Sequence, residues 1–234
     1  MNWYVKLCSK NIFVSQDIKI QIEEISSEIF YKLNQFNLSK KESEFVKEIK
    51  VGLLPVNIFM VRSNQRSMSS LASTGVDDKG EHFINVYVIN LRWIAEFDKD
   101  DSYYRRILYD AILHEVVHNI DPKLTTREKE FGYKKKHEEI ERLEYEDNKN
   151  WKNRYFNSQP EFDAFSAQVS DYIRNFLGTN PLKKDFVLDI LRSNDIRKIT
   201  EIIGTVDAGF IVNIDERNKR RLKQRIYNDI KDLL

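Results

Sequence analysis

The segment from Asp101 to Ile120 constrains the fold most, because its apolar residues recur at helical spacing on one broad face. They are Leu108, Ile112, Leu113, Val116, Val117 and Ile120. Asp101 or Ser102 can cap the start of such a helix, and Pro122 disfavours helical geometry at Asp121 and so ends it. The sequence therefore predicts a long helix with one face in a core.

Two of the four histidines, His114 and His118, lie one helical turn apart in this segment. Residues four apart share a helix face, so the two imidazoles can bind one metal ion. Glu115 lies about 100° around the helix from His114, where it can reach a metal-bound water as a base. A chance pair of core histidines is the alternative interpretation, and the surrounding helix favours the metal site.

A catalytic zinc site needs a third protein ligand and leaves its fourth position open for water. The best candidate is Glu161, near the start of a further apolar helix that we expect from about Ser158 to Leu177. Ser158 and Glu161 are three residues apart, so a capping box without catalytic meaning is the competing interpretation. Asp163 is the alternative carboxylate ligand.

The sequence resembles the gluzincins in three features. These are the His-Glu-Val-Val-His motif, the 42 residues between His118 and Glu161, and the Glu-Phe-x-Ala start of the next helix. Gluzincins are zincin metallopeptidases with a glutamate as third ligand. The resemblance covers about residues 82 to 177 and is greatest to the small catalytic domains of the anthrax lethal factor type. It implies an α+β fold that is mainly helical, with a small mixed sheet and the motif on the active-site helix.

The resemblance further implies a peptidase that acts on peptides or proteins. Zinc held by His114, His118 and Glu161 would activate a water molecule, with Glu115 as the general base. In this group a tyrosine upstream of the third ligand binds the oxyanion. Tyr155 lies in the corresponding neighbourhood, six residues before Glu161 where seven are expected. The alternative function is a catalytically silent helical binding module on a zincin-like scaffold.

Two apolar segments predict strands, residues 56 to 61 after Pro55 and Phe83 to Leu91. In the family a strand above the metal pairs with an extended substrate, which suggests this role for Phe83 to Leu91, with an ordinary sheet strand as the alternative. Residues 17 to 50 favour one or two amphipathic helices. We expect residues 1–180 to form the metallopeptidase domain and residues 181–234 a helical subdomain packed on it.

Other polar residues have weaker claims on a site. Asp121 either supports a ligand histidine through a hydrogen bond or simply ends its helix before Pro122. His82 at a strand end and His137 within a charged run are more typical of polar surface. Cys8 is the single cysteine and has no motif around it.

The charge balance argues against partners that are recognised by a global field. Lys and Arg number 38 against 37 Asp and Glu, so we expect neither nucleic acid nor a membrane as partner. The basic cluster from Arg217 to Arg225 is interpreted as a solvated helix face rather than a phosphate-binding surface. One cysteine, no apparent secretory signal and no long apolar run favour a cytoplasmic setting. The peptidase hypothesis includes a gene that belongs to a bacterium, a phage or a mobile element.

Overall fold

The computed structural model describes residues 14–33, 35–36, 42–51, 54–62, 71–97, 101–120, 151–193, 195–203 and 208–234. The chain divides into two compact units. The sheet unit comprises Phe13–Pro122, and the helical unit comprises Met1–Ile12 together with Lys123–Leu234. The predicted boundary at residue 180 does not coincide with this division.

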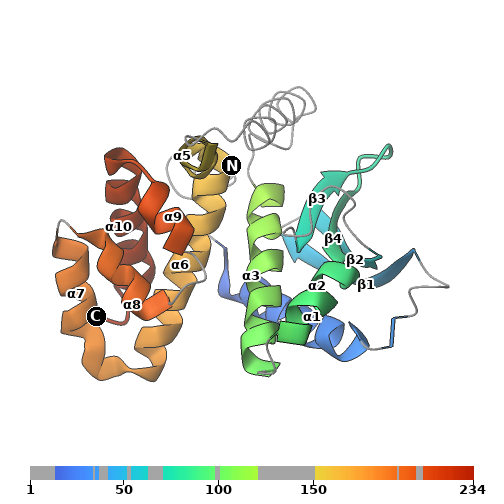
Figure 1. Cartoon of the computed structure of the whole chain (residues 1–234), viewed down its shortest axis with the longest axis horizontal. Coiled ribbons are helices and arrows are strands. Elements are labelled where there is room, and N and C mark those ends of the chain that lie inside the picture. The colour runs from blue at the N-terminus through green and yellow to red at the C-terminus, as the bar shows by residue number, and fades with distance from the viewer. Residues whose placement is uncertain are drawn as a thin grey trace, which may run out of the picture. The chain divides into compact units, whose positions relative to one another are not determined.

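The sheet unit combines helices with one mixed sheet (Figure 1). Its described elements are α1 (Gln16–Leu33), β1 (Ser43–Val51), β2 (Leu54–Val61), β3 (Ala72–Val76), β4 (His82–Tyr87), α2 (Val88–Phe97) and α3 (Asp101–Ile120). The strand order is β1-β2-β4-β3. β2 and β4 run parallel, whereas β1 is antiparallel to β2 and β3 is antiparallel to β4. The predicted α+β class with a small mixed sheet is confirmed.

One face of this sheet and the apolar face of α3 share a core. Alternate residues of the inner strands are fully buried, namely Val56, Ile58, Met60, Ile84 and Val86. The apolar residues of the predicted long helix are buried as well, namely Leu108, Ile112, Leu113, Val116 and Val117. Burial of both sets stabilises the unit through the hydrophobic effect and fixes the rotation of α3 about its axis.

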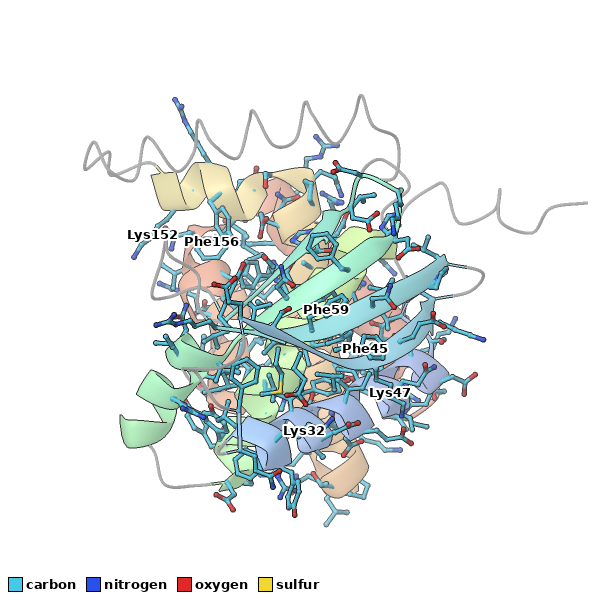
Figure 2. All side chains as sticks on the ribbon, turned by 90° about the vertical axis from the view of Figure 1, so that its right-hand side faces the viewer. Lys32, Phe45, Lys47, Phe59, Lys152 and Phe156 are labelled. Carbon is cyan, nitrogen blue, oxygen red and sulfur yellow. The ribbon has the colours of Figure 1, made fainter. Side chains whose placement is uncertain are left out.

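The opposite face of the sheet carries aromatic side chains (Figure 2). Phe45 from β1 and Phe59 from β2 meet edge to face with ring centroids 5.6 Å apart. Lys47, which follows the bulge in β1 and pairs with Ile58 of β2, reaches Glu24 of α1, with 3.0 Å between Nζ and the carboxylate oxygen. Cross-strand aromatic pairs of this kind add to the stability of a sheet.

The sequence predicted several of these elements correctly. The helix from Asp101 is confirmed as α3, and the strand at residues 56 to 61 is confirmed as part of β2. The predicted strand Phe83 to Leu91 is correct only to Tyr87, because Val88 already begins α2 without an intervening glycine or proline.

The prediction of helices over residues 17 to 50 is right for α1 and wrong for β1. A β-bulge between Phe45 and Lys47 shifts the register of β1 against β2. It leaves the buried residues Val46 and Ile49 three positions apart, which is the spacing of a helix face. The bulge therefore gives two buried residues of this strand the spacing that is typical of a helix.

The helical unit is built around α6. Its described elements are α5 (Trp151–Asn157), α6 (Gln159–Thr179), η2 (Pro181–Lys183), α7 (Lys184–Arg192), η3 (Ile196–Ile199), α8 (Thr200–Ile203), α9 (Ala208–Asn213) and α10 (Glu216–Ile230). The helix predicted from about Ser158 to Leu177 is confirmed as α6. Buried residues of α6 join one core with those of the later helices, among them Phe162, Ile173, Val187, Phe210, Leu222 and Ile226. This shared core explains why the unit continues across residue 180.

The basic cluster of α10 is largely engaged within the helical unit. Arg225 is buried, Lys223 donates to the main-chain carbonyl of Ser193, and Lys219 pairs with Glu216 at 2.7 Å. The solvent-facing members are Arg217 and Arg220. The cluster is therefore mostly part of the packing of the unit. Among the described helices, none combines the length and apolar character that crossing a bilayer requires.

Candidate metal site

α3 carries the two histidines of the motif on one side of the helix. The imidazole rings of His114 and His118 have centroids 4.6 Å apart and planes at 83°. His118 is 6% exposed and His114 is partly buried. Their neighbours Leu113 and Val117 are fully buried in the core of the sheet unit. Packing of the apolar face thus holds both imidazoles on the same flank of α3, as the spacing predicted.

Glu115 lies between them in sequence and is partly buried. Its main-chain carbonyl accepts a hydrogen bond from Nδ2 of Asn119 at 3.0 Å. The helical period directs its side chain about 100° away from that of His114. Its role as a general base stays a prediction.

Glu161 lies in the first turn of α6 and is 2% exposed. The competing capping box is absent. Ser158 makes no side-chain cap hydrogen bond, and its Oγ instead donates to the carbonyl of Tyr155 at 2.8 Å. The N–H of Ser158 donates to the carbonyls of Arg154 and Tyr155, both at 3.1 Å. Neither half of a capping box therefore exists, and that interpretation of Glu161 is wrong.

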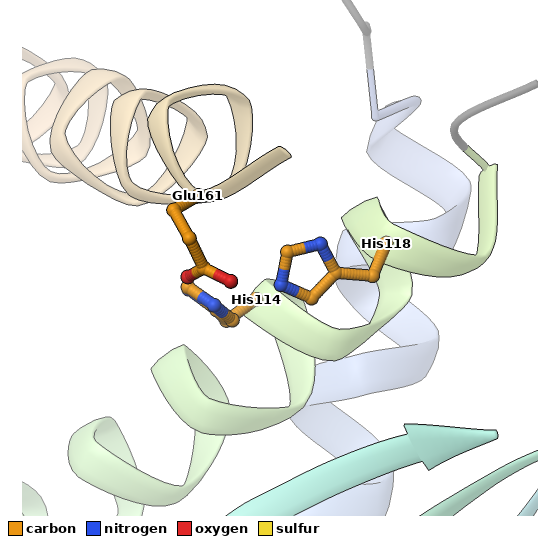
Figure 3. Close-up of side chains that lie close together, drawn as sticks. All are labelled: His114, His118 and Glu161. Atoms are coloured by element: carbon orange, nitrogen blue, oxygen red, sulfur yellow. The ribbon is translucent and has the colours of Figure 1, made fainter. Parts of the chain in front are cut away.

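The structure brings the three residues predicted as ligands together (Figure 3). His114, His118 and Glu161 each offer one ligand atom, and these atoms all lie within 4.8 Å of one another. Two imidazole nitrogens and one carboxylate oxygen are a donor set that fits a divalent metal ion.

Asp163, the alternative carboxylate, lies outside this group. It is 6% exposed, and its carboxylate accepts a hydrogen bond from Gln159 Nε2. Its other oxygen lies 3.6 Å from Nη2 of Arg221. Asp163 therefore contributes to the packing of α10 on α6, whereas Glu161 has the position of a ligand.

Tyr155, the predicted oxyanion donor, lies in α5. Its ring contacts those of Phe156 and Phe165, with centroid distances of 5.2 and 6.2 Å. These contacts fix the ring of Tyr155 on the start of α6, and its catalytic role stays a prediction. Asp121, His137 and Cys8 lie outside the described residues.

The prediction that Phe83 to Leu91 pairs with substrate is wrong. β4 lies between β2 and β3 and is hydrogen-bonded to both, so neither of its edges is open. β3 is the edge strand on this side of the sheet. A peptide that extends the sheet at this side must therefore pair with β3.

His82 and Asn119 form a polar contact that sequence reasoning missed. Nδ1 of His82 lies 2.8 Å from Oδ1 of Asn119. The available signal was an asparagine directly after His118, four residues beyond Glu115 and at the end of a buried helix. His82 is thus more than the polar surface residue that its strand position suggested.

Comparisons of the chain with protein-family models, with curated proteins and with solved structures give no match. The resemblance to the gluzincins therefore rests on the motif residues and on the grouping of His114, His118 and Glu161.

Proposed function

We propose that the protein is a zinc-dependent peptidase of the gluzincin kind. The observation that carries the proposal is the grouping of His114, His118 and Glu161, whose ligand atoms lie within 4.8 Å of one another. Two histidines and a glutamate are the ligand set of zinc peptidases that keep a fourth position for water. Peptides or proteins are the proposed substrates.

The chemistry follows from the donor set and from the residue beside it. Zinc held by His114, His118 and Glu161 would supply Lewis-acid polarisation of the scissile carbonyl and would lower the pKa of a water molecule towards ~7. Glu115 would accept a proton from the attacking water and would then donate that proton to the departing amine. Proton transfer by a positioned carboxylate is worth about 10²- to 10⁴-fold in rate.

Two further parts of the chain contribute to the proposed reaction. Tyr155 donates a hydrogen bond to the oxyanion, a contact worth on the order of 3 kcal/mol. The edge strand β3 forms main-chain hydrogen bonds with the extended substrate, and alternate side chains of the substrate then face opposite sides.

A peptide library tests the proposal directly. The purified protein is expected to hold close to one zinc ion per chain and to cleave library peptides until a chelator is added. Glu115→Gln keeps the shape of the side chain and the metal but cannot accept the proton, so hydrolysis should fall by about 10²-fold or more. Cleavage that survives in this variant would overturn the mechanism.

The same experiment separates the peptidase from the catalytically silent binding module. A wild-type protein that binds zinc through the same three residues but cleaves no peptide is the module. Both interpretations are contradicted if the protein binds no metal and if a chelator does not change its unfolding free energy.

A further inference from the structure

A short chain of hydrogen bonds joins the end of α3 to two strands of the sheet. Nδ2 of Asn119 donates to Oγ1 of Thr74 in β3 and to the carbonyl of Glu115. Oδ1 of Asn119 contacts Nδ1 of His82 at the start of β4. Oγ1 of Thr74 donates onward to the carbonyl of Phe83 at 3.0 Å. Asn119 is therefore the point at which three elements of the sheet unit are tied together.

In this hydrogen-bond network, each group determines whether its neighbour donates or accepts. The Glu115 carbonyl can only accept, so the amide of Asn119 must direct its NH₂ group there. Oδ1 then faces His82 and can only accept, so the proton of that hydrogen bond belongs to Nδ1 of His82. Thr74 accepts from Asn119 and donates to Phe83, which completes a consistent direction through the network. A neutral His82 is thus held as the Nδ1–H tautomer.

Asn119 lies beside the proposed site residues of α3 and connects them to the sheet. Asn119 is 4% exposed, directly follows His118 and holds the carbonyl of Glu115. The last two turns of α3 therefore include a proposed ligand, the proposed base and a residue anchored to the sheet. A hydrogen-bonded amide with no spare donor resists rotation of this turn, because any rotation leaves buried polar groups unsatisfied.

We propose that Asn119 and His82 are positioning residues that hold His118 and Glu115 in the geometry needed for metal binding and proton transfer. The catalytic part of this inference rests on the proposed function. The structural part, the Nδ1–H tautomer and the anchoring of the turn, does not. Loss of groups that orient metal ligands typically weakens metal affinity or activity by about 10- to 100-fold.

Two substitutions of His82 form a matched pair. The amide nitrogen of asparagine stands as many bonds from Cβ as Nδ1 of histidine, whereas that of glutamine matches Nε2. His82→Asn therefore keeps the hydrogen bond to Asn119, and His82→Gln loses it. His82 is partly exposed, so both variants are expected to fold. Asn119→Leu removes the whole junction at similar volume.

The first measurement needs neither metal nor substrate. Long-range ¹⁵N–¹H correlation spectra of the metal-free protein at alkaline pH report which nitrogen of His82 carries the proton. The expected result is the Nδ1–H tautomer in the wild type, whereas neutral imidazole in water prefers the other. An Nε2–H tautomer would overturn the proposal whatever the activity.

The second measurement is zinc affinity, by competition with a chromogenic chelator, together with kcat and KM at saturating zinc. His82→Gln and Asn119→Leu should lose about 10- to 100-fold in zinc affinity or in kcat with little change in KM, and His82→Asn should stay near the wild type. Equal behaviour of His82→Asn and His82→Gln contradicts the inference. If the wild type cleaves nothing while the tautomer and the order of zinc affinities hold, the peptidase proposal fails and the positioning role stands.

Discussion

Glu161 in the first turn of α6 and Asp163 two residues later are both buried, but only Glu161 groups with the histidines of α3. Asp163 instead contacts Gln159 and Arg221. These two neighbouring carboxylates thus have different contacts, and they form a matched pair for mutation.

Glu161→Gln should weaken zinc binding by at least about 100-fold, because an amide is a poorer metal ligand than a carboxylate. Asp163→Asn should leave zinc affinity near that of the wild type while lowering stability. Chelator competition measures the first and urea unfolding the second. Similar zinc affinities in the two variants would remove Glu161 from the site.

Zinc should raise the melting temperature of the wild type, because a ligand that binds only the folded state stabilises it by about 2.7 kcal/mol at 100 times its dissociation constant. His114→Ala and His118→Ala should lose this increase, since each removes one imidazole of the pair. His137→Ala, a histidine outside the motif, is the control and should keep it. Thermal unfolding with and without zinc makes the comparison, and an undiminished shift in His118→Ala would argue against the site.

Gly75→Ala should destabilise the sheet unit by about 1 to 3 kcal/mol through overpacking. A Cβ at this position would lie 2.6 Å from Cζ of Phe83, whose ring crosses the glycine. Phe83→Leu in the same chain shortens the side chain, so the double variant should lose less stability than the two single changes added together. Denaturant unfolding of the four proteins gives this coupling, and strict additivity would show that the contact is absent.

Arg225→Ala should cost about 3 kcal/mol of unfolding free energy, because it leaves buried acceptors without their donor. Nη1 of Arg225 donates to the carbonyl of Asp163 at 3.1 Å and to Oγ of Ser166 at 3.0 Å. Burial lowers the pKa of Arg225, while the nearby carboxylates of Asp229 and Asp163 oppose that shift. Arg217→Ala on the exposed side of α10 is the control and should change stability little.

Acid should remove the contribution of Asp232 to stability. Its carboxylate forms two hydrogen bonds with Arg174, at 2.7 and 2.6 Å, and this contact lowers the pKa of Asp232 to about 2. A carboxyl whose pKa is lower in the folded state stabilises the fold above its unfolded pKa of about 3.9. That contribution declines as the pH falls from about 4 towards 2. Asp232→Asn should therefore be less stable than the wild type at pH 6, and the difference should shrink at pH 2 in urea unfolding.

The elements that the sequence predicts best are those whose local pattern agrees with their tertiary burial. α3 and β2 have clear periods of helix and strand, and both are confirmed. β1 was missed because the helical spacing of the preceding residues was extended to residue 50, and the bulge in β1 interrupts the alternation that would have indicated a strand. Local spacing cannot reveal such a bulge, which depends on pairing with β2.

The residues of the candidate site also differ in how well the sequence predicts their neighbours. His114 and His118 are linked by the helical period, so five residues of sequence suffice to pair them. The junction of Asn119 with His82 spans 37 residues and depends on where β4 meets the end of α3. No local pattern encodes that meeting. Glu161 was expected as the third ligand because a catalytic zinc site needs one and a further apolar helix begins near it, and the family resemblance pointed to the same residue.

The carboxylate of Glu161 could either cap the start of α6 together with Ser158 or contribute to the candidate metal site. In a capping box Glu161 would accept from the N–H of Ser158, and the start of α6 would gain about 1 kcal/mol. Here the hydroxyl of Ser158 points back to Tyr155, and that stabilisation is forgone. The N–H of Ser158 is satisfied by the carbonyls of Arg154 and Tyr155, so the start of α6 does not need the carboxylate of Glu161 as a cap. Because this N–H is satisfied without it, the carboxylate of Glu161 is left to group with His114 and His118.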